Sequence, residues 1–429
     1  MQGKKYDFLI VGSGMGGATL ARELSRKGKE VLVLERGERA QKIGTFEEIR
    51  HHYDGNHVTN IPAKSKEGVI MWRTLMAGGS TVVACGNGVR CLEKELAEHG
   101  IVLDGEFAEI EREMGIAPIH ERLLSEGAKK IVWASGELGY KMELMPKFID
   151  PAKCGKCGNC TLGCAKGAKW TALDYLDEAS QQGAKVLNES MVQEVLVENG
   201  KARGVMTLGT EGSRKILADI VVLAAGGLGT PVILQNSGIS QAGPGLFIDL
   251  FVNTYGTTSG LNQIHEPAMA VVDLEFHQEK GFILSPFMSH PRLVRFVEIG
   301  ARGLASSSKS MIGIMAKTTD DPAGCVFPDG SVSKPVTEAD RRRLKEGSGI
   351  SREILIKAGA EPKSIVVSKV QGGHPGGTAA IGKVVDKELQ TKVDGLFVCD
   401  ASVLPAAPGL PPMLTIGALA KRLAKTLAP

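Results

Sequence analysis

Short apolar runs alternate with turns and amphipathic stretches along the chain, a pattern typical of α/β proteins. Residues 7–11 and 31–35 form two mostly apolar runs, and apolar residues recur at helical spacing over 18–24 between them. Strands that are apolar throughout are characteristic of buried parallel strands. The order strand, helix, strand therefore predicts the start of a Rossmann-like parallel sheet.

The same kind of pattern returns far along the chain. Strand-like runs at 192–197, 204–208 and 220–225 follow one another, and a late run at 395–399 precedes a terminal helix at 414–427. Strands that lie so far apart in sequence can still join one sheet, as parallel sheets are connected by long crossovers. We therefore expect one cofactor domain built from separated segments.

Two intervening stretches have a different character. Residues 93–150 are mostly helical by pattern, whereas 251–364 mix strands with a helix near 338–346. We expect these stretches to form an α+β substrate domain that is interleaved with the cofactor domain. The cofactor domain is expected to comprise residues 1–90, 151–250 and 365–429, and the substrate domain residues 91–150 and 251–364.

Composition narrows the classes of protein that fit this pattern. Lys and Arg number 51 against 48 Asp and Glu, a net charge of +3, and 5% of residues are aromatic. Such a chain lacks the basic field and the stacking surface that nucleic acids or an anionic membrane would require. Glycine stands out at 54 of 429 residues. Because glycine is used where backbone turns tightly or approaches a ligand, we expect a cofactor contacted by main chain.

The distribution of apolar residues also bears on location. The run before the first glycines is too short for a signal peptide, and no later stretch reaches the ~18 apolar residues of a membrane span. We therefore expect a cytoplasmic protein without an integral membrane segment. In that compartment the eight cysteines would stay reduced.

A dinucleotide-binding fingerprint follows the first strand. Gly12, Gly14 and Gly17 match G-x-G-x-x-G, and Glu35 ends the next strand. In this motif the first glycine makes the turn, the second admits the pyrophosphate, and the third lets the helix pack on the strand. The helix amino terminus then faces the phosphates, and Glu35 is placed to accept a hydrogen bond from a ribose hydroxyl.

The fingerprint alone does not distinguish NAD from FAD. The apolar strand at 220–227 ends in small residues, and the late strand at 398–402 ends in an acid. Three ligand-facing segments at the start, middle and end of the chain suit a long ligand. They favour FAD.

These motifs, in this order, resemble the glucose–methanol–choline (GMC) oxidoreductase family over most of the chain outside 265–364. Besides the fingerprint, the resemblance rests on Gly78-Gly79-Ser80-Thr81 with Asn87, on Ala225-Gly226-Gly227-Leu228-Gly229-Thr230-Pro231 with Leu234 and Ser237-Gly238, and on Asp400-Ala401-Ser402-Val403-Leu404-Pro405 with Thr415 and Ala418-Leu419-Ala420. It implies an FAD-binding domain with a separate substrate domain, and hydride exchange with the flavin. The residues expected to contact FAD are Gly12, Gly14, Gly17, Glu35, Gly79, Ser80, Asn87, Val192, Ala225, Gly226, Asp400, Ala401 and Thr415.

His374 is the candidate catalytic residue. It lies in the glycine-rich segment 372–378, and an imidazole with an ordinary pKa near ~6.5 can take a hydroxyl proton as hydride leaves. The resemblance implies that role, since GMC enzymes carry a histidine in such a His-Pro-x-Gly context beside the flavin. The alternative is a turn histidine that bonds to backbone. The family's second active-site position, usually His or Asn, falls on Pro411, which can neither donate nor exchange a proton.

Four cysteines form the most unusual local feature. Cys154, Cys157, Cys160 and Cys164 follow the spacing C-x2-C-x2-C-x3-C, interleaved with glycines. This spacing resembles a ferredoxin run, in which thiolates hold a [4Fe–4S] cluster, although no proline follows the fourth cysteine here. Structural zinc and metal-free family packing are the alternatives. We expect the cluster, which would offer a one-electron exit toward a protein acceptor.

The substrate side carries fewer signals. Polar groups occur at His265-Glu266 and at His290, and Arg292 or Arg295 would be able to grip a substrate carboxylate or form a surface ion pair. The reading that joins these observations is an FAD-dependent oxidoreductase that exchanges hydride with a small organic alcohol or its carbonyl. The alternatives are a flavin and iron–sulfur subunit serving a redox protein partner, and a reductase of carbon–carbon double bonds.

Overall fold

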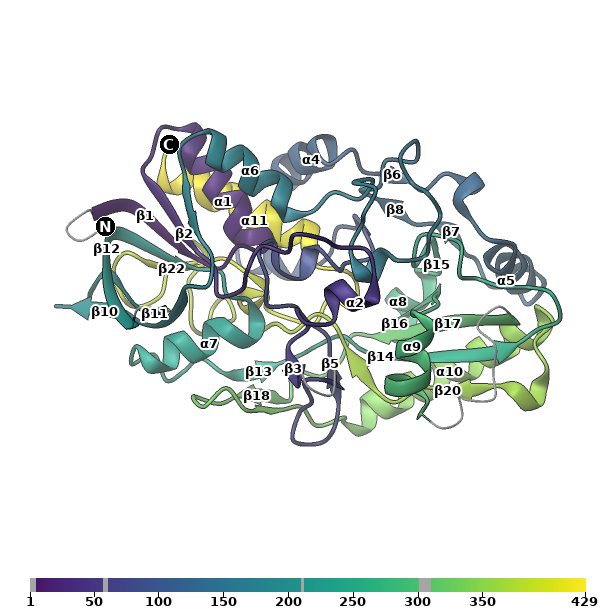
Figure 1. The fold of residues 1–429 in the computed structure, drawn as a ribbon. Helices are drawn as coiled ribbons and strands as arrows, with labels where there is room; N and C mark the ends of the chain where they lie inside the picture. Colours follow the sequence, from purple (N-terminus) through teal and green to yellow (C-terminus); the bar gives the residue numbers. More distant parts are fainter. Residues whose placement is uncertain (1–4, 57–60, 210–211, 301–309) are drawn as a thin grey trace.

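Two β-sheets occupy opposite ends of an elongated molecule in the computed structural model (Figure 1). The structure describes residues 5–56, 61–209, 212–300 and 310–429. The first sheet contains seven strands and the second contains six. Loops and helices from several parts of the chain join the two sheets.

The first sheet is parallel at its centre, as the apolar runs predict. Its strands are β1 (Lys5–Val11), β2 (Val31–Leu34), β9 (Lys185–Leu187), β10 (Met191–Glu198), β11 (Lys201–Gly209), β12 (Gly212–Leu223) and β22 (Leu396–Val398). Strands β9, β2, β1, β12 and β22 run parallel, and β10 and β11 extend the sheet in antiparallel fashion. The first and last thirds of the chain therefore meet in one sheet.

Helices cover both faces of this sheet. Helix α1 (Met15–Arg26) packs against α6 (Ala172–Gln181) and α11 (Met413–Leu427) on one face, while α7 (Gly226–Asn236) packs on β10 at the other (Figure 1). A capping box starts α6, in which Thr171 N donates to Asp174 Oδ2 over 2.7 Å. This arrangement is the doubly covered α/β layer structure that the sequence predicts.

The second sheet is mixed and mostly antiparallel. Its strands are β5 (Ile70–Met71), β14 (Leu250–Thr257), β16 (Phe282–Pro286), β17 (Met311–Thr318), β20 (Val366–Val367) and β21 (Gln371–Gly372). Strand β14 pairs antiparallel with β17 and with β21, and β21 pairs parallel with β5. Residues 70–71 and 366–372, from segments expected in the cofactor domain, are thus hydrogen-bonded into the sheet of the other lobe.

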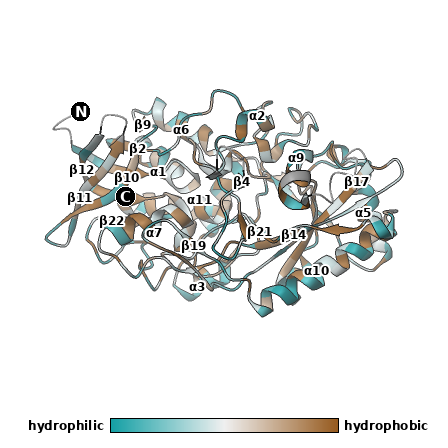
Figure 2. Cartoon of the chain, turned by 60° about the horizontal axis from the view of Figure 1, so that its bottom comes forward, coloured by the Kyte–Doolittle hydropathy of each residue, from teal (hydrophilic) through white to brown (hydrophobic). Residues whose placement is uncertain are grey.

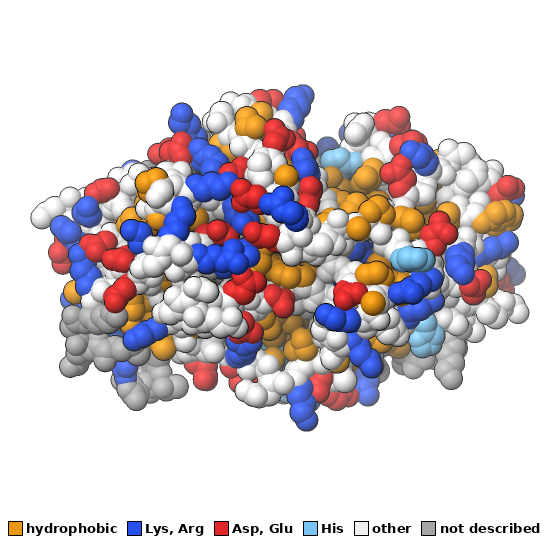
Figure 3. Space-filling view, turned by 90° about the horizontal axis from the view of Figure 1, so that it is seen from above, with side chains coloured by type: hydrophobic (Ala, Val, Ile, Leu, Met, Phe, Trp, Pro, Cys, Tyr) orange, Lys and Arg blue, Asp and Glu red, His pale blue; other side chains and the backbone are white. Residues whose placement is uncertain are grey.

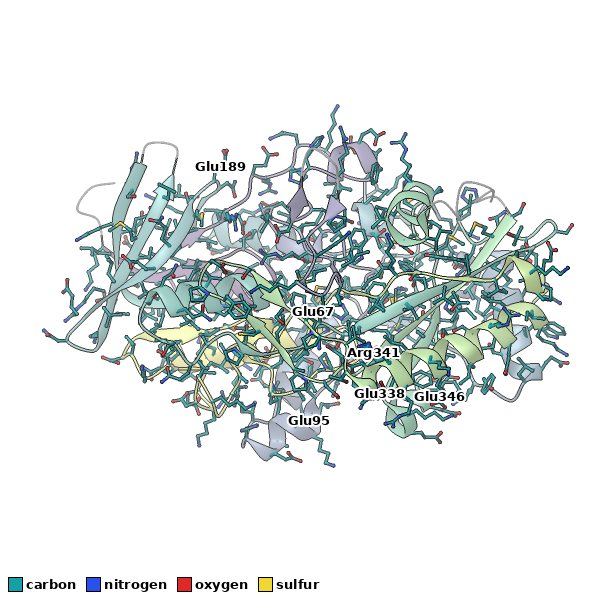
Figure 4. The ribbon with its side chains drawn as sticks, turned by 90° about the horizontal axis from the view of Figure 1, so that it is seen from below. Glu67, Glu95, Glu189, Glu338, Arg341 and Glu346 are labelled. Atoms are coloured by element: carbon teal, nitrogen blue, oxygen red, sulfur yellow. The ribbon has the colours of Figure 1, made fainter. Side chains whose placement is uncertain are left out.

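Helix α10 (Glu338–Lys357) covers one face of the second sheet, and it is longer than the predicted helix near 338–346. Leu344, Ile354 and Leu355 are buried against the strands. Glu338, Arg341 and Glu346 lie on the outer side, where they are exposed (Figure 4). Hydrophilic residues along α10 and hydrophobic ones on β14 show the same division (Figure 2).

Shorter elements connect the two lobes. The longer helices among them are α3 (Glu93–Glu98), α4 (Asp104–Glu113), α5 (Glu126–Glu137) and α8 (Glu275–Lys280), and two short helices are α2 (Phe46–Ile49) and α9 (Pro291–Leu293). The short strands are β3 (Gly55–Asn56), β4 (Ile61–Pro62), β6 (Ala117–Pro118), β7 (Glu143–Leu144), β8 (Pro146–Lys147), β13 (Pro244–Leu246), β15 (Val271–Val272), β18 (Gly324–Val326) and β19 (Val332–Ser333). Across the described ranges, no helix has the length and apolar character needed to traverse a bilayer. Acidic and basic side chains are intermixed on the face shown in Figure 3, in keeping with the small net charge.

Candidate active site

The glycine fingerprint forms a tight loop between β1 and α1. Gly12 has φ +100°, and a Cβ there would lie 2.3 Å from the carbonyl oxygen of Ala224. A Cβ on Gly17 would lie 2.0 Å from Gly12 O, so helix and strand are in close contact. A Cβ added to Gly14, by contrast, would meet no heavy atom within 4 Å. The loop is packed where it turns and open at Gly14, where a pyrophosphate would approach.

Glu35 joins the fingerprint to the second predicted flavin loop. Its buried carboxylate accepts hydrogen bonds from Ser13 N over 3.0 Å, from Ser13 Oγ over 2.5 Å and from Gly37 N over 2.8 Å. Burial raises the pKa of Glu35, and these hydrogen bonds oppose that rise. Ser13 Oγ also accepts from Gly78 N over 3.0 Å. The loop that carries Gly79 and Ser80 is therefore held against the fingerprint.

Asp400 joins the middle predicted segment, around Gly226, to the closing one by hydrogen bonds. Its carboxylate accepts from Gly226 N over 2.8 Å, from Thr230 Oγ1 over 2.5 Å and from Ser402 N over 2.8 Å. Burial raises the pKa of Asp400 despite these bonds. Ala225 precedes α7, and a Cβ on Gly226 would meet nothing within 4 Å. The two predicted segments, far apart in sequence, thus form one surface.

Further predicted flavin-contacting residues lie at the lobe junction. Asn87 is buried, and its side-chain oxygen accepts from the ammonium of Lys147. Thr415, in the first turn of α11, donates from Oγ1 to Cys91 O over 2.9 Å. Val192 lies farther away, buried in the antiparallel strand β10.

His374 is held by a carboxylate that the sequence analysis did not identify. Its Nδ1 lies 2.8 Å from Oδ2 of Asp249, which is fully buried. The strand register explains the meeting, because Leu250 of β14 is paired with Gly372 of β21. Asp249 adopts φ 51°, an uncommon value for a non-glycine residue. Burial lowers the pKa of His374, as does the charge of Lys317, while Asp249 raises it. The imidazole is therefore biased toward its neutral form, which can accept a proton.

The closing loop touches the same carboxylate. Gly409 N donates to Asp249 Oδ1 over 3.0 Å, two residues before Pro411, which is buried. Ala401 O accepts from Gly377 N over 3.1 Å, so the Asp400 segment lies beside the histidine loop. The family's two active-site segments therefore converge here, although one of them offers only proline.

Lys317 completes the cluster of His374 and Asp249, and the sequence did not identify it either. It lies on β17 with 3% of its side chain exposed, and its Nζ is 3.8 Å from Asp249 Oδ2. No residue in the described part of the chain is within hydrogen-bonding distance of that Nζ. Burial lowers the pKa of Lys317, and Asp249 raises it. The available sequence signal for Lys317 was a single lysine directly after the apolar stretch 311–316. Asp249 carried a similar signal, because it directly follows the apolar run 246–248.

The four cysteines do not form the predicted metal site. Cys154 and Cys164 pack against the small apolar cluster that includes Ile149, Cys160 packs against the main core, and Cys157 is exposed. Over the ranges that the structure describes, no group of three or more His, Cys, Asp or Glu side chains is arranged to hold a metal ion. The prediction of a [4Fe–4S] cluster is therefore not confirmed.

The polar groups of the substrate side are partly brought together. A pocket of about 190 Å³ is lined by His265, Glu266 and His290, together with Cys157 and Gln263. Arg292 does not line this pocket; it forms an exposed ion pair with Glu47, which is the alternative considered for it above. The side chain of Arg295 lies outside the described part of the structure.

The residues at the first sheet fit an FAD. The space above Gly14 suits a pyrophosphate, and α1 begins there without any side-chain cap, which leaves backbone N–H groups for an anion. Glu35 supplies a buried carboxylate at the end of β2. The segments around Gly79, Gly226 and Thr415 would hold the rest of the molecule. FAD, when bound, supplies a two-electron acceptor for hydride.

Comparison with known proteins agrees with this arrangement. The sequence matches the GMC oxidoreductase family over residues 6–250 and 318–420. An uncharacterized protein of Methanocaldococcus jannaschii is 31% identical over 98% of this chain and 100% of its own length. A long-chain-alcohol oxidase of Arabidopsis thaliana is 25% identical over 99% of this chain and 68% of its own.

Solved structures share the fold. The crystal structure of pyridoxine 4-oxidase from Mesorbium loti gives a TM-score of 0.75 at 18% identity, covering 98% of this chain and 99% of the other. A formate oxidase of Aspergillus oryzae gives a TM-score of 0.75 at 15% identity, covering 100% of this chain and 98% of the other. With the amino- and carboxy-terminal segments of the family both matched along the chain, this protein belongs to the GMC oxidoreductases, a family of FAD-dependent enzymes that act on CH–OH donors.

Proposed function

We propose that the protein oxidises the CH–OH group of a small organic alcohol, with His374 as the base that removes the hydroxyl proton. The hydrogen bond between His374 Nδ1 and the buried Asp249 carries this proposal. It fixes the imidazole so that Nδ1–H faces the carboxylate and the other ring nitrogen, Nε2, faces away from it. A neutral histidine held in this way accepts a proton at Nε2.

The surrounding residues support the same role. The carboxylate of Asp249 would stabilise the imidazolium that forms when His374 takes a proton. Backbone also positions the loop, because the N–H groups of Gly373 and His374 both donate to Ile248 O over 3.0 Å. The histidine is thus oriented by its side chain and by its main chain.

The reverse direction uses the same residues, with His374 donating the proton to a carbonyl oxygen. Reduction of a carbon–carbon double bond is a third possibility, since Pro411 removes the usual second group. We place alcohol oxidation first because curated relatives include long-chain-alcohol oxidases.

An anaerobic spectral titration tests the proposal. Purified protein with bound FAD is mixed with a panel of primary and secondary alcohols, ketones and enones, and the flavin absorbance is followed. We expect at least one alcohol to bleach the flavin in the wild type and not in His374→Gln. Failure of every alcohol to reduce a fully loaded protein would refute alcohol oxidation. Oxidation of pre-reduced protein by an enone alone would favour the double-bond reductase.

A different candidate function is electron transfer through the cysteine loop, residues 154–164, to a redox protein partner. The spacing of Cys154, Cys157, Cys160 and Cys164 supports it, and the buried ammonium of Lys169 holds the loop by donating to Cys160 O over 2.9 Å. The separate surroundings of the four thiols weigh against it. Iron analysis of anaerobically purified protein, with absorbance near ~400 nm after flavin removal, decides between them. Iron-free protein would leave oxidation by His374 intact and eliminate the relay.

A further inference from the structure

The active site lacks a second polar group at the position where its family usually has one. Pro411 occupies that position and has no proton to give. When a hydroxyl loses its proton to His374, negative charge develops on the substrate oxygen. A site that promotes this step needs a hydrogen-bond donor for that oxygen.

Lys317 is a buried donor close to His374 that makes no hydrogen bond within the described residues, although it forms an ion pair with Asp249. Its Nζ and the Nδ1 of His374 approach the same atom, Oδ2 of Asp249, at 3.8 Å and 2.8 Å. The two nitrogens are therefore no farther apart than the sum of those distances. No described residue accepts a hydrogen bond from Nζ, although only 3% of the side chain is exposed. The ion pair with Asp249 at 3.8 Å is too long to be a hydrogen bond, and a buried ammonium without a hydrogen bond is costly. The place of Lys317 in the fold therefore points to an acceptor supplied by a ligand.

The sheet brings Lys317 to this position by register. Strand β17 pairs antiparallel with β14, where Lys317 lies opposite Phe251, two residues after Asp249. The following turn reaches the closing loop, because a Cβ on Gly409 would lie 2.5 Å from Thr319 Cγ2. The lysine thus lies at the same end of the second sheet as the histidine, and it is near the loop that contains Pro411.

The charged and titratable groups facing this position come from three elements. Asp249 and His374 lie at the ends of β14 and β21, and the thiols of Cys85 and Cys91 act from the loop before α3. Cys91 is hydrogen-bonded to Thr415, one of the expected flavin contacts. The charge of Lys317 therefore acts both on the histidine and on a thiol whose backbone contacts an expected flavin-binding residue.

We propose that Lys317 is the second active-site group, whose Nζ donates a hydrogen bond to the substrate oxygen that gives its proton to His374. The O–H bond breaks, the proton moves to Nε2 of His374, and the electron pair stays on the oxygen as an alkoxide. The ammonium of Lys317 keeps its protons and stabilises that charge. This assignment rests on the proposed function, and it identifies substrates whose reacting oxygen becomes anionic.

The experiment uses acetate as a probe, because its carboxylate imitates the anionic oxygen without reacting. Acetate is titrated into oxidised, FAD-loaded wild type, Lys317→Met, Lys317→Arg and Lys280→Met, and the flavin difference spectrum gives the dissociation constant. Lys280 is the control, since it is on the same lobe and is paired with Glu346 at the surface. We expect Lys317→Met to weaken acetate binding about tenfold or more, Lys317→Arg to retain most of the affinity, and Lys280→Met to match wild type.

Two results would overturn the assignment: unchanged acetate affinity in Lys317→Met, and no acetate binding to wild type. If the affinity is unchanged while the flavin spectrum of Lys317→Met differs from that of wild type without acetate, the lysine faces FAD itself.

A second measurement covers the case in which Lys317→Met does not fold. The pKa of His374 is followed by NMR of 15N-histidine-labelled Lys317→Gln protein and assigned with His374→Gln. We expect it to rise, because a neighbouring positive charge is removed, and no rise would contradict the assignment. Neither measurement needs turnover. A panel in which no alcohol reduces the flavin would therefore refute the proposed function while leaving the anion-binding result standing.

Discussion

Asp249 binds His374 through one carboxylate oxygen and Gly409 through the other, at 2.8 Å and 3.0 Å. One buried side chain therefore connects the histidine loop with the closing loop of the chain. Since Asp249 lies directly before β14, its position is fixed by the central strand of the second sheet. The orientation of the proposed base depends on this carboxylate more than on any residue of its own loop.

Replacement of His374 by Gln should abolish most of the turnover and leave FAD bound. General base catalysis contributes about 10²–10⁴-fold, and the residue lies outside the glycine loops that would hold the cofactor. Flavin content from the visible spectrum and kcat with the best alcohol of the panel measure the two effects separately. Wild-type turnover in the variant would remove His374 from the mechanism.

Replacement of Asp249 by Asn should reduce turnover at least ~10²-fold. The amide offers both a donor and an acceptor, so it no longer fixes Nδ1 as the protonated nitrogen of His374. Asp249→Glu, which keeps the charge at a different distance, serves as the comparison. Equal turnover in wild type and Asp249→Asn would show that the carboxylate has a structural role only.

The pH dependence of oxidation should show an acid limb below the ordinary histidine value. Oxidation needs neutral His374, so kcat/KM rises with pH through its pKa, which burial and Lys317 lower from 6.5. The limb therefore lies below about pH 6.5. In Asp249→Asn it should move farther down, because a carboxylate that raises this pKa is lost. A limb centred well above neutrality would contradict the assignment of the base.

Asp400→Ala should weaken FAD retention. The change removes the acceptor of three hydrogen bonds, two of them from the middle segment at Gly226 and Thr230. Because the unpaired donors stay buried, we expect a loss of about 2–4 kcal/mol in the free energy of unfolding. Flavin released on gel filtration and the thermal midpoint are the readouts. Asp394→Ala, at an exposed ion pair with Lys201, should change neither.

Glu266 should make stability fall as pH rises. Burial raises the pKa of this carboxyl from 4.5 to about 7, while its hydrogen bonds to Ser125 oppose the rise. The folded state therefore binds a proton that the unfolded state releases between about pH 4.5 and 7. Across that window the group costs up to about 3 kcal/mol of stability.

The test compares the free energy of unfolding of wild type and Glu266→Gln at pH 5 and pH 8. The free energy of unfolding of Glu266→Gln should increase relative to that of wild type as the pH is raised, since its amide does not ionise. Glu126→Gln, at an exposed position, is the control. A constant difference between the two proteins would show that Glu266 is charged throughout.

The sequence was sufficient for the parts of the fold that local pattern determines. Apolar runs and the glycine fingerprint located β1, α1 and β2 to within a few residues. The strand predicted at 220–225 is part of a longer one, Gly212–Leu223, because its first half is exposed and reads as a turn region.

The partners of His374 were beyond local pattern. Asp249 reaches the imidazole only because Leu250 pairs with Gly372, a register between residues more than a hundred positions apart. Lys317 depends in the same way on the pairing of β17 with β14. For the cysteines the spacing was clear, yet spacing does not fix where each thiol points. The packing of the surrounding residues, which the motif does not contain, sets Cys160 against the main core and Cys154 and Cys164 against a smaller apolar cluster.

The order in which the first sheet is completed has a consequence for synthesis. Strand β22 (Leu396–Val398) pairs with β12, and α11 (Met413–Leu427) packs on α1, so these two late elements close the most amino-terminal layer. During synthesis, the side of α1 that packs on α11 therefore stays uncovered until both elements have left the ribosome. A polypeptide truncated before residue 396 would lack β22 and α11, and its exposed apolar surface would favour aggregation and proteolysis.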